Sequence, residues 1–240
     1  MINQIKKTTN SLLSKFGYKI SKLGNGFSFN QNLEWLKEKN IGTILDIGAN
    51  DGQFAKFINS VLPEARIYSF EPIKSCYEKL NILASKIPKL MPINIGLGDK
   101  SEFIELNVNE FTPSSSILSM EKRHIENFPF TSKSVKEKIE VKDLDSIYHN
   151  LQIEQNVLVK IDVQGYEGRV LKGSWRFLSE IPGIIIIIEC SIIPLYKDEP
   201  SVEEIYDMLR SLKYSYKGNL NQLYSPVNGE ILQADLIFQK

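Results

Sequence analysis

Residues 44–52 are Ile44-Leu45-Asp46-Ile47-Gly48-Ala49-Asn50-Asp51-Gly52. The apolar run predicts a buried strand over residues 43–47, and the residues that follow predict a helix over 52–59. Glycine lets the backbone turn sharply at Gly48 and lets a ligand approach closely at Gly52. In open α/β sheets, ligands bind at the carboxyl ends of the strands, next to such turns. The stretch therefore predicts the opening unit of a ligand-binding α/β domain.

The rest of the chain alternates strand and helix patterns. Strands are expected at 66–70, 90–95, 102–108, 138–141, 157–161, 184–188 and 236–238, and helices at 74–86, 144–149, 165–172 and 202–212. Strands separated by helices favour a mostly parallel, Rossmann-like sheet with helices on both faces. Residues 110–135 have no clear pattern, and a long loop of this kind usually serves as a lid or binding loop.

The first part of the chain differs in charge. Residues 1–33 contain five lysines and no acid, so this segment is +5 and the remainder is −5. Apolar residues fall near one helical stripe there. We therefore expect a helical extension over residues 1–41, with a short helix near 32–38, and a single domain over 42–240. Two interpretations of the stripe stay open: packing on the domain, and peripheral membrane contact through residues 1–24.

Composition narrows the class of protein. The 29 basic and 29 acidic residues cancel, which argues against a dedicated nucleic-acid binder. Two cysteines, Cys76 and Cys190, are too few for a disulfide framework and indicate a reducing cytosol. The longest aliphatic run, residues 184–188, is far shorter than the roughly 20 residues of a membrane span. We expect a cytoplasmic protein, located at the inner membrane face if residues 1–24 bind lipid.

The glycine loop has an unusual spacing, Asp-x-Gly-x-x-x-Gly. It is not the Gly-x-Gly-x-x-Gly that cradles a pyrophosphate, and Asp46 would repel such a group. An acid there suits a ligand with an ammonium group, such as S-adenosylmethionine. The next strand ends in Glu71-Pro72, where a carboxylate can accept both ribose hydroxyl hydrogens. The predicted cofactor-binding residues are thus Asp46, Gly48, Ala49, Asn50, Asp51, Gly52, Glu71 and Pro72. The competing interpretation is turn glycines with surface acids.

Gly98 and Asp99 follow the third strand. Glycine lets the backbone approach a flat adenine, and Asp99 could accept a hydrogen from its amino group. A simple Gly-Asp turn before the next strand explains the same residues.

A second group of charges follows the strand at 157–161. Lys160 and Asp162 lie two apart and share one face of the strand, and charges at such a place must face a cleft or a partner. Glu189, after the five-isoleucine strand, would lie beside them. We predict that Asp162 is the base or acceptor-orienting group, with Lys160, Glu167 and Glu189 supporting it. The alternative is a purely structural Lys160–acid pair.

A metal ion or a histidine could also take part in this chemistry. No metal site is predicted. The only plausible ligand set consists of two carboxylates, Asp162 and Glu189, which would suit Mg²⁺. His124 lies in the long loop, where a solvated side chain is the ordinary expectation and a lid-borne base the alternative.

Taken together, these motifs resemble those of the FkbM family of methyltransferases. The resemblance rests on residues 46–52, Phe70-Glu71-Pro72, residues 96–99 and 144–147, and most specifically on Lys160-Ile161-Asp162-Val163-Gln164-Gly165-Tyr166-Glu167 with Leu171-Lys172-Gly173. It implies a class I methyltransferase fold and S-adenosylmethionine-dependent O-methylation of a sugar, glycan or small natural product, as in polysaccharide biosynthesis. The family often has Glu where this chain has Gln164, which leaves Asp162 to supply a carboxylate.

The acceptor atom follows by exclusion. Enzymes that methylate exocyclic amines of bases often carry an Asn/Asp-Pro-Pro-aromatic turn after the fourth strand, and here that place holds Asp162-Val163-Gln164-Gly165. Oxygen is therefore favoured over nitrogen, and a small-molecule or glycan acceptor over nucleic acid. Two other function classes remain: a non-catalytic module that retains the cofactor fold, and an NAD-dependent oxidoreductase, which the absent pyrophosphate motif disfavours.

Overall fold

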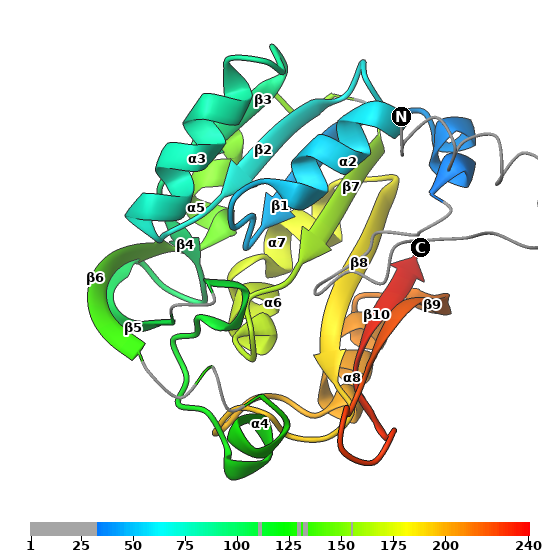
Figure 1. Ribbon diagram of the computed structural model, residues 1–240. Coiled ribbons are helices and arrows are strands. Elements are labelled where there is room, and N and C mark those ends of the chain that lie inside the picture. The colour runs from blue at the N-terminus through cyan, green and yellow to red at the C-terminus, as the bar shows by residue number, and fades with distance from the viewer. Residues whose placement is uncertain (1–32, 110–111, 129–130, 132–133, 155) are drawn as a thin grey trace, which may run out of the picture. The chain divides into compact units, whose positions relative to one another are not determined.

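The computed structural model describes residues 33–109, 112–128, 131, 134–154 and 156–240 (Figure 1). The extension predicted over residues 1–41 falls mostly outside this range, so its helical stripe and the membrane contact predicted for residues 1–24 stay predictions. Its described end is a short 3-10 helix, η2 (Glu34–Lys39), which is followed directly by the first strand.

A seven-stranded sheet forms the centre of the domain. Its strand order is β3-β2-β1-β7-β8-β10-β9. The first five of these are mutually parallel, and β10 runs antiparallel to both β8 and β9. The strands are β1 (Ile41–Ile47), β2 (Arg66–Phe70), β3 (Leu90–Ile93), β7 (Asn156–Ile161), β8 (Ile184–Ser191), β9 (Ser215–Tyr224) and β10 (Ile231–Gln239). This is the mostly parallel α/β sheet that the sequence predicts.

Helices cover both faces of this sheet. In Figure 1, α2 (Gln53–Val61) and α3 (Lys74–Ala84) lie on one face, and α6 (Glu167–Gly173) and α7 (Trp175–Glu180) lie on the other. The second face also carries α5 (Leu144–Ile147), its 3-10 continuation η5 (Tyr148–Asn150), and α8 (Val202–Ser211), whose apolar residues share one core with the strands. A capping box of Ser201 and Glu204 starts α8. No helix in the described part of the chain is long and apolar enough to cross a membrane.

A smaller sheet contains β4 (Gly96–Leu97), β6 (Ser134–Lys142) and β5 (Glu102–Asn109), in that order. The segment between β5 and β6 was expected to be irregular over residues 110–135. Its described residues include a 3-10 turn, η3 (Thr112–Ser114), and a short helix, α4 (Lys122–Asn127). Both are too short to produce a periodic pattern in the sequence.

The sequence pattern did not predict β9 or α7, and it predicted only the last part of β10. The β9 strand is polar because it is an edge strand that exposes much of its length, so it lacks an apolar signal. The six residues of α7 span fewer than two turns, which is too short for a periodicity to show.

Strand register aligns the carboxyl ends where the predicted site residues lie. Asp46 pairs with Lys160 on one neighbouring strand and with Ser69 on the other. Ile161 pairs with Ile188, so Asp162 and Glu189 follow at the same level. The isoleucines of β8 are buried, at roughly 1.5–3 kcal/mol for each fully buried side chain. They anchor the strand that holds Glu189.

Candidate active site

The turn after β1 fits only glycine at its first position. Gly48 has a φ of +80°, and a Cβ atom placed there would lie 1.8 Å from the carbonyl oxygen of Asp162. Its N–H and that of Ala49 both donate to the carbonyl of Phe70 at 3.1 Å. The loop that follows β1 therefore packs directly against the end of β7. Farther along, Gly52 has a φ of +86° and precedes the first residue of α2.

Asp46 lies buried at the end of β1. The Ser69 hydroxyl donates to its Oδ2 atom at 3.1 Å, whereas Oδ1 has no hydrogen-bond partner among the described residues. Burial raises the pKa of Asp46 to about 6, and Lys160 opposes the shift. The Oδ1 atom of Asp51 is also buried without a partner in the described chain. Buried acceptors normally have partners, so these two open acceptors, one at the end of β1 and one in the loop after it, fit a ligand with hydrogen-bond donors.

Glu71 ties this loop to the end of β2. Its Oε2 atom accepts the N–H of Asn50 at 2.7 Å, and its Oε1 atom accepts the N–H of Ile73 at 2.8 Å. Burial raises the pKa of Glu71 to about 7. The amide of Asn94 donates to the carbonyls of Glu71 and Pro72, which holds the loop after β2 in place. The carboxylate thus lies at the sheet edge where the sequence predicts ribose recognition.

Gly98 and Asp99 lie against the start of the smaller sheet and α6. Gly98 donates its N–H to the carbonyl of Lys142, and a Cβ atom on Gly173 would lie 1.7 Å from the Gly98 oxygen. Asp99 Oδ2 pairs with the guanidinium of Arg169 at 2.6 Å, and Oδ1 is buried without a partner among the described residues. The role of Asp99 at an adenine ring stays a prediction.

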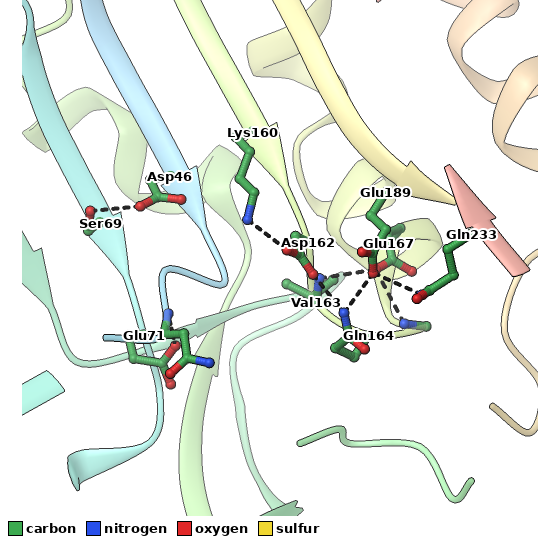
Figure 2. Close-up of polar contacts among 12 residues, drawn as sticks. Asp46, Ser69, Glu71, Lys160, Asp162, Val163, Gln164, Glu167, Glu189 and Gln233 are labelled. Carbon is green, nitrogen blue, oxygen red and sulfur yellow. Dashed lines mark hydrogen bonds and ion pairs between the residues drawn. The ribbon is translucent and has the colours of Figure 1, made fainter. Parts of the chain in front are cut away.

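A second polar group forms at the ends of β7 and β8 (Figure 2). Lys160 donates to Asp162 Oδ2 at 2.8 Å, which is the ion pair of the alternative, structural interpretation. Gln164 bridges the carboxylates, donating to Asp162 Oδ1 at 2.8 Å and to Glu189 Oε2 at 2.6 Å. Gln233 of β10 donates to the same Glu189 oxygen at 2.9 Å. The strands thus bring three of the predicted residues together: Lys160, Asp162 and Glu189.

The charged side chains of this second polar group differ in how deeply they are buried. The Asp162 side chain is 27% exposed, against 9% for Lys160. Burial raises the pKa of Glu189 well above its usual range, and the negative charge of Asp162 adds to the shift. Burial alone would lower the pKa of Lys160, but the nearby carboxylates of Asp162 and Asp46 raise it overall. Asp162 is therefore the carboxylate that is both held in place and open to a ligand.

Glu167 belongs to the turn that carries this group. Its Oε1 atom accepts the N–H groups of Val163 at 3.0 Å and Gly165 at 3.2 Å. Gln164 and Gly165 both have positive φ, which delays the start of α6 to Glu167 from the predicted Gly165. Burial raises the pKa of Glu167 to about 8. Glu167 thus holds the turn, and its support for Asp162 acts through the backbone.

Sequence reasoning missed Tyr196 and misplaced His124. The Tyr196 hydroxyl donates to Gln164 Oε1 at 2.7 Å, and His124 Nε2 lies 3.3 Å from that hydroxyl. The expectation of a solvated His124 is wrong, because its side chain is 3% exposed and packs on Phe128 and Tyr196. Burial lowers the pKa of His124 to about 4. Tyr196 comes from a segment with no motif, so no sequence signal marks it.

Among the described residues, no group of three or more His, Cys, Asp or Glu side chains is arranged to hold a metal ion.

Comparisons with known proteins bear on this geometry. One curated relative is the 2-O-methyltransferase NoeI of Sinorhizobium fredii, 24% identical over 84% of each chain. Another is the hexuronic acid methyltransferase AglP of Haloferax volcanii, 24% identical over 62% of this chain and 56% of its own. A solved FkbM methyltransferase from Methylobacillus flagellatus superposes with a TM-score of 0.52 at 16% identity. That match covers 81% of this chain and 43% of the other, and it shows a shared fold.

The family model "Methyltransferase FkbM domain" matches residues 46–216, which runs from the buried acid of β1 into β9. This range contains both groups of polar side chains described above, apart from Gln233. The open acceptors at Asp46 and Asp51 fit the donor-bearing cofactor that the sequence predicts. The chain belongs to the FkbM methyltransferase family, and its cofactor is S-adenosylmethionine.

Proposed function

We propose that this protein is an O-methyltransferase that methylates a hydroxyl group of a sugar, glycan or small natural product, with Asp162 as the proton acceptor. One observation carries the proposal. The glycine loop after β1 packs against the backbone of Asp162, as the 1.8 Å separation between a Gly48 Cβ and the Asp162 oxygen indicates. The most open carboxylate of the second polar group thus adjoins the loop predicted to bind the cofactor.

The cofactor-binding residues are those at the ends of β1 and β2. Asp46 and the loop through Gly52 present buried acceptors to an ammonium group, and Glu71 presents a carboxylate to ribose hydroxyls. Bound S-adenosylmethionine supplies an already activated methyl group. The protein has the remaining tasks of orienting the acceptor hydroxyl and accepting its proton.

Asp162 is suited to those tasks. Lys160 and Gln164 each donate to a different oxygen of its carboxylate, which fixes the orientation of the side chain. An ionised carboxylate within hydrogen-bond reach of a hydroxyl can take its proton, a contribution of about 10²–10⁴-fold in rate. Glu189 is more deeply buried, and burial raises its pKa well above the usual value, so we assign it a supporting role.

The names of the relatives support an oxygen acceptor on a sugar. One is called a 2-O-methyltransferase and the other a hexuronic acid methyltransferase. Both are 24% identical to this chain, so they suggest the class of acceptor and not its identity. Family membership decides against the NAD-dependent oxidoreductase that the sequence left open.

A labelled-methyl transfer assay tests the proposal. The full chain is incubated with methyl-tritiated S-adenosylmethionine and a panel of neutral sugars, uronates, amino sugars and small phenols and alcohols. We expect label in a hydroxyl-bearing compound, at an oxygen that mass spectrometry of the product locates. Label only at nitrogen would contradict the proposal. Binding of S-adenosylhomocysteine without transfer to any member would favour the non-catalytic module.

A further inference from the structure

Two residues of the candidate site have an uncommon backbone conformation. Asn50, in the loop after β1, has a φ of +49°, and Gln164, in the turn after β7, has a φ of +53°. Residues other than glycine rarely adopt such values, and they keep them only where the surrounding structure holds them. Each of the two lies two positions beyond the contact between Gly48 and the Asp162 carbonyl. The loop and the turn therefore each need a further contact that fixes them.

One segment of the chain, residues 112–118, supplies both contacts. Thr112 of η3 donates its hydroxyl hydrogen to Asn50 Oδ1 at 3.0 Å. Ser116 donates its hydroxyl hydrogen to the backbone carbonyl of Gln164 at 2.5 Å. The second contact is with the backbone, so it does not depend on the side chain at position 164. Two hydroxyls of one segment thus connect the loop after β1 to the turn that carries Asp162.

Hydrogen bonds to the end of β5 hold this segment in place. The backbones of Asn107 and Ser116 exchange two hydrogen bonds, at 2.9 and 3.2 Å. The backbone N–H of Asn109 donates to Ser115 Oγ at 3.0 Å, and its side-chain amide donates to the carbonyl of Ser114 at 2.6 Å. All three serines are buried. The spacing between the two bridging hydroxyls is therefore set by the fold of the segment against β5.

Asn50 depends on the Thr112 hydroxyl more than on its other side-chain contact. The N–H of Asn50 donates to Glu71 Oε2 at 2.7 Å, which fixes its backbone. Its side-chain oxygen accepts from Thr112 and from the Cys76 thiol, whose sulfur lies 3.3 Å away. A thiol is a weak donor, so Thr112 supplies the stronger bond to this oxygen. Loss of the hydroxyl should loosen the residue that is bonded to Glu71.

We propose that Thr112 and Ser116 are positioning residues, which together hold the loop after β1 and the turn that carries Asp162 at a fixed separation. The inference rests on the proposed function, in which the loop binds the cofactor and Asp162 faces the acceptor hydroxyl. Methyl transfer depends on the distance between donor and acceptor, and a misplacement of about 1 Å can cost about a hundredfold in rate. Both residues act through the groups they hold.

Three substitutions and two matched controls test the proposal. Thr112→Val keeps the shape and removes the hydroxyl, Thr112→Ser keeps the hydroxyl, and Ser116→Ala removes the second hydroxyl. As controls, Thr43→Val removes a buried threonine hydroxyl near the opposite end of β1, and Ser174→Ala removes a buried serine hydroxyl between α6 and α7. Each control hydroxyl also donates to a backbone carbonyl, at 3.0 and 2.7 Å.

Calorimetry of the full chain with S-adenosylhomocysteine is the first readout, and it needs no acceptor. We expect Thr112→Val to bind about threefold to tenfold more weakly, as the net loss of one hydrogen bond implies. Thr112→Ser and both controls should stay within about twofold of wild type. Ser116→Ala should weaken binding less than Thr112→Val does, because it frees the far end of the same segment. The Thr112→Val/Ser116→Ala double variant should bind no more weakly than Thr112→Val.

Turnover is the second readout, once an acceptor is identified. We expect kcat to fall about tenfold in Thr112→Val and in Ser116→Ala, and to fall no further in the double variant. A merely structural role would lower stability and leave kcat of the folded enzyme unchanged.

The outcomes separate the inference from the proposed function. Unchanged affinity in Thr112→Val overturns the inference, and so does an equal loss in Thr112→Ser or Thr43→Val. Losses that multiply in the double variant also overturn it, because they would show two independent contacts. If Ser116→Ala fails to fold, the comparison of Thr112→Val with Thr112→Ser decides. Absence of methyl transfer from the wild-type chain to any hydroxyl would instead refute the proposed function, and the affinity comparison would still test the inference.

Discussion

Replacing Gly48 by alanine tests the contact between the cofactor loop and β7. Gly48 and Gly229 have nearly equal φ values, +80° and +78°, but a Cβ on Gly48 would lie 1.8 Å from the Asp162 oxygen, whereas nothing lies within 4 Å of one on Gly229. Gly229 lies in the connection between β9 and β10. The pair therefore separates backbone strain from collision with Asp162.

Both substitutions carry the left-handed penalty of about 1–2 kcal/mol. Both also reduce the freedom of the unfolded chain in the same way, so that effect cancels in the comparison. Gly48→Ala carries in addition an overpacking cost of about 1–3 kcal/mol. The neighbour cannot easily withdraw, because the N–H of Asp162 is bonded to the carbonyl of Ile47 at 3.0 Å.

Urea unfolding of both variants measures the difference. We expect Gly48→Ala to lose about 1–3 kcal/mol more than Gly229→Ala, and to bind S-adenosylhomocysteine more weakly by calorimetry. Gly229→Ala should retain wild-type affinity. Equal losses of stability, with unchanged affinity in both variants, would refute the packing of this loop against β7.

Three further predictions concern the buried acids and the first residues of the chain. Glu71→Gln should weaken S-adenosylhomocysteine binding about tenfold in calorimetry, because one amide oxygen must replace two carboxylate oxygens that accept the N–H groups of Asn50 and Ile73; unchanged affinity would contradict this. Glu167 has a folded pKa of about 8, above its ordinary 4.5, so the folded state binds the extra proton between these two values, and stability falls as pH rises from 4.5 to about 8. The melting temperature should therefore drop as pH rises from 6.5 to 8, a range above the opposite effect of His124, and should level off beyond 8. Glu167→Gln should make the drop less steep; equal slopes in the two proteins would contradict this. The full chain should float with anionic vesicles and a variant starting at Gln31 should not, if residues 1–24 contact a membrane surface; no difference between them rejects the contact.

The sequence predicts the parts of the site that follow from strand geometry. Asp46, Glu71 and Asp162 each lie where a strand of the parallel sheet ends, and the carboxyl ends of parallel strands align. The period of two along β7 places Lys160 and Asp162 on one face, and they pair at 2.8 Å.

The remaining partners depend on long-range packing that no local pattern encodes. Gln164 reaches Glu189 because two consecutive residues adopt positive φ, and Gln233 arrives on an antiparallel strand near the end of the chain. Tyr196 and His124 meet across 72 positions of sequence. Sequence spacing cannot show such contacts, because they arise only when the loops fold over the sheet edge.

Asp162→Asn tests the central claim most directly. The substitution keeps the shape of the side chain and removes its capacity to accept a proton. With saturating S-adenosylmethionine and an identified hydroxyl acceptor, we expect turnover to fall by about 10²–10⁴-fold. The affinity for S-adenosylhomocysteine should stay within about twofold of wild type, because Asp46 and Glu71, not Asp162, are the acids proposed to bind the cofactor. Wild-type turnover by this variant would contradict the account.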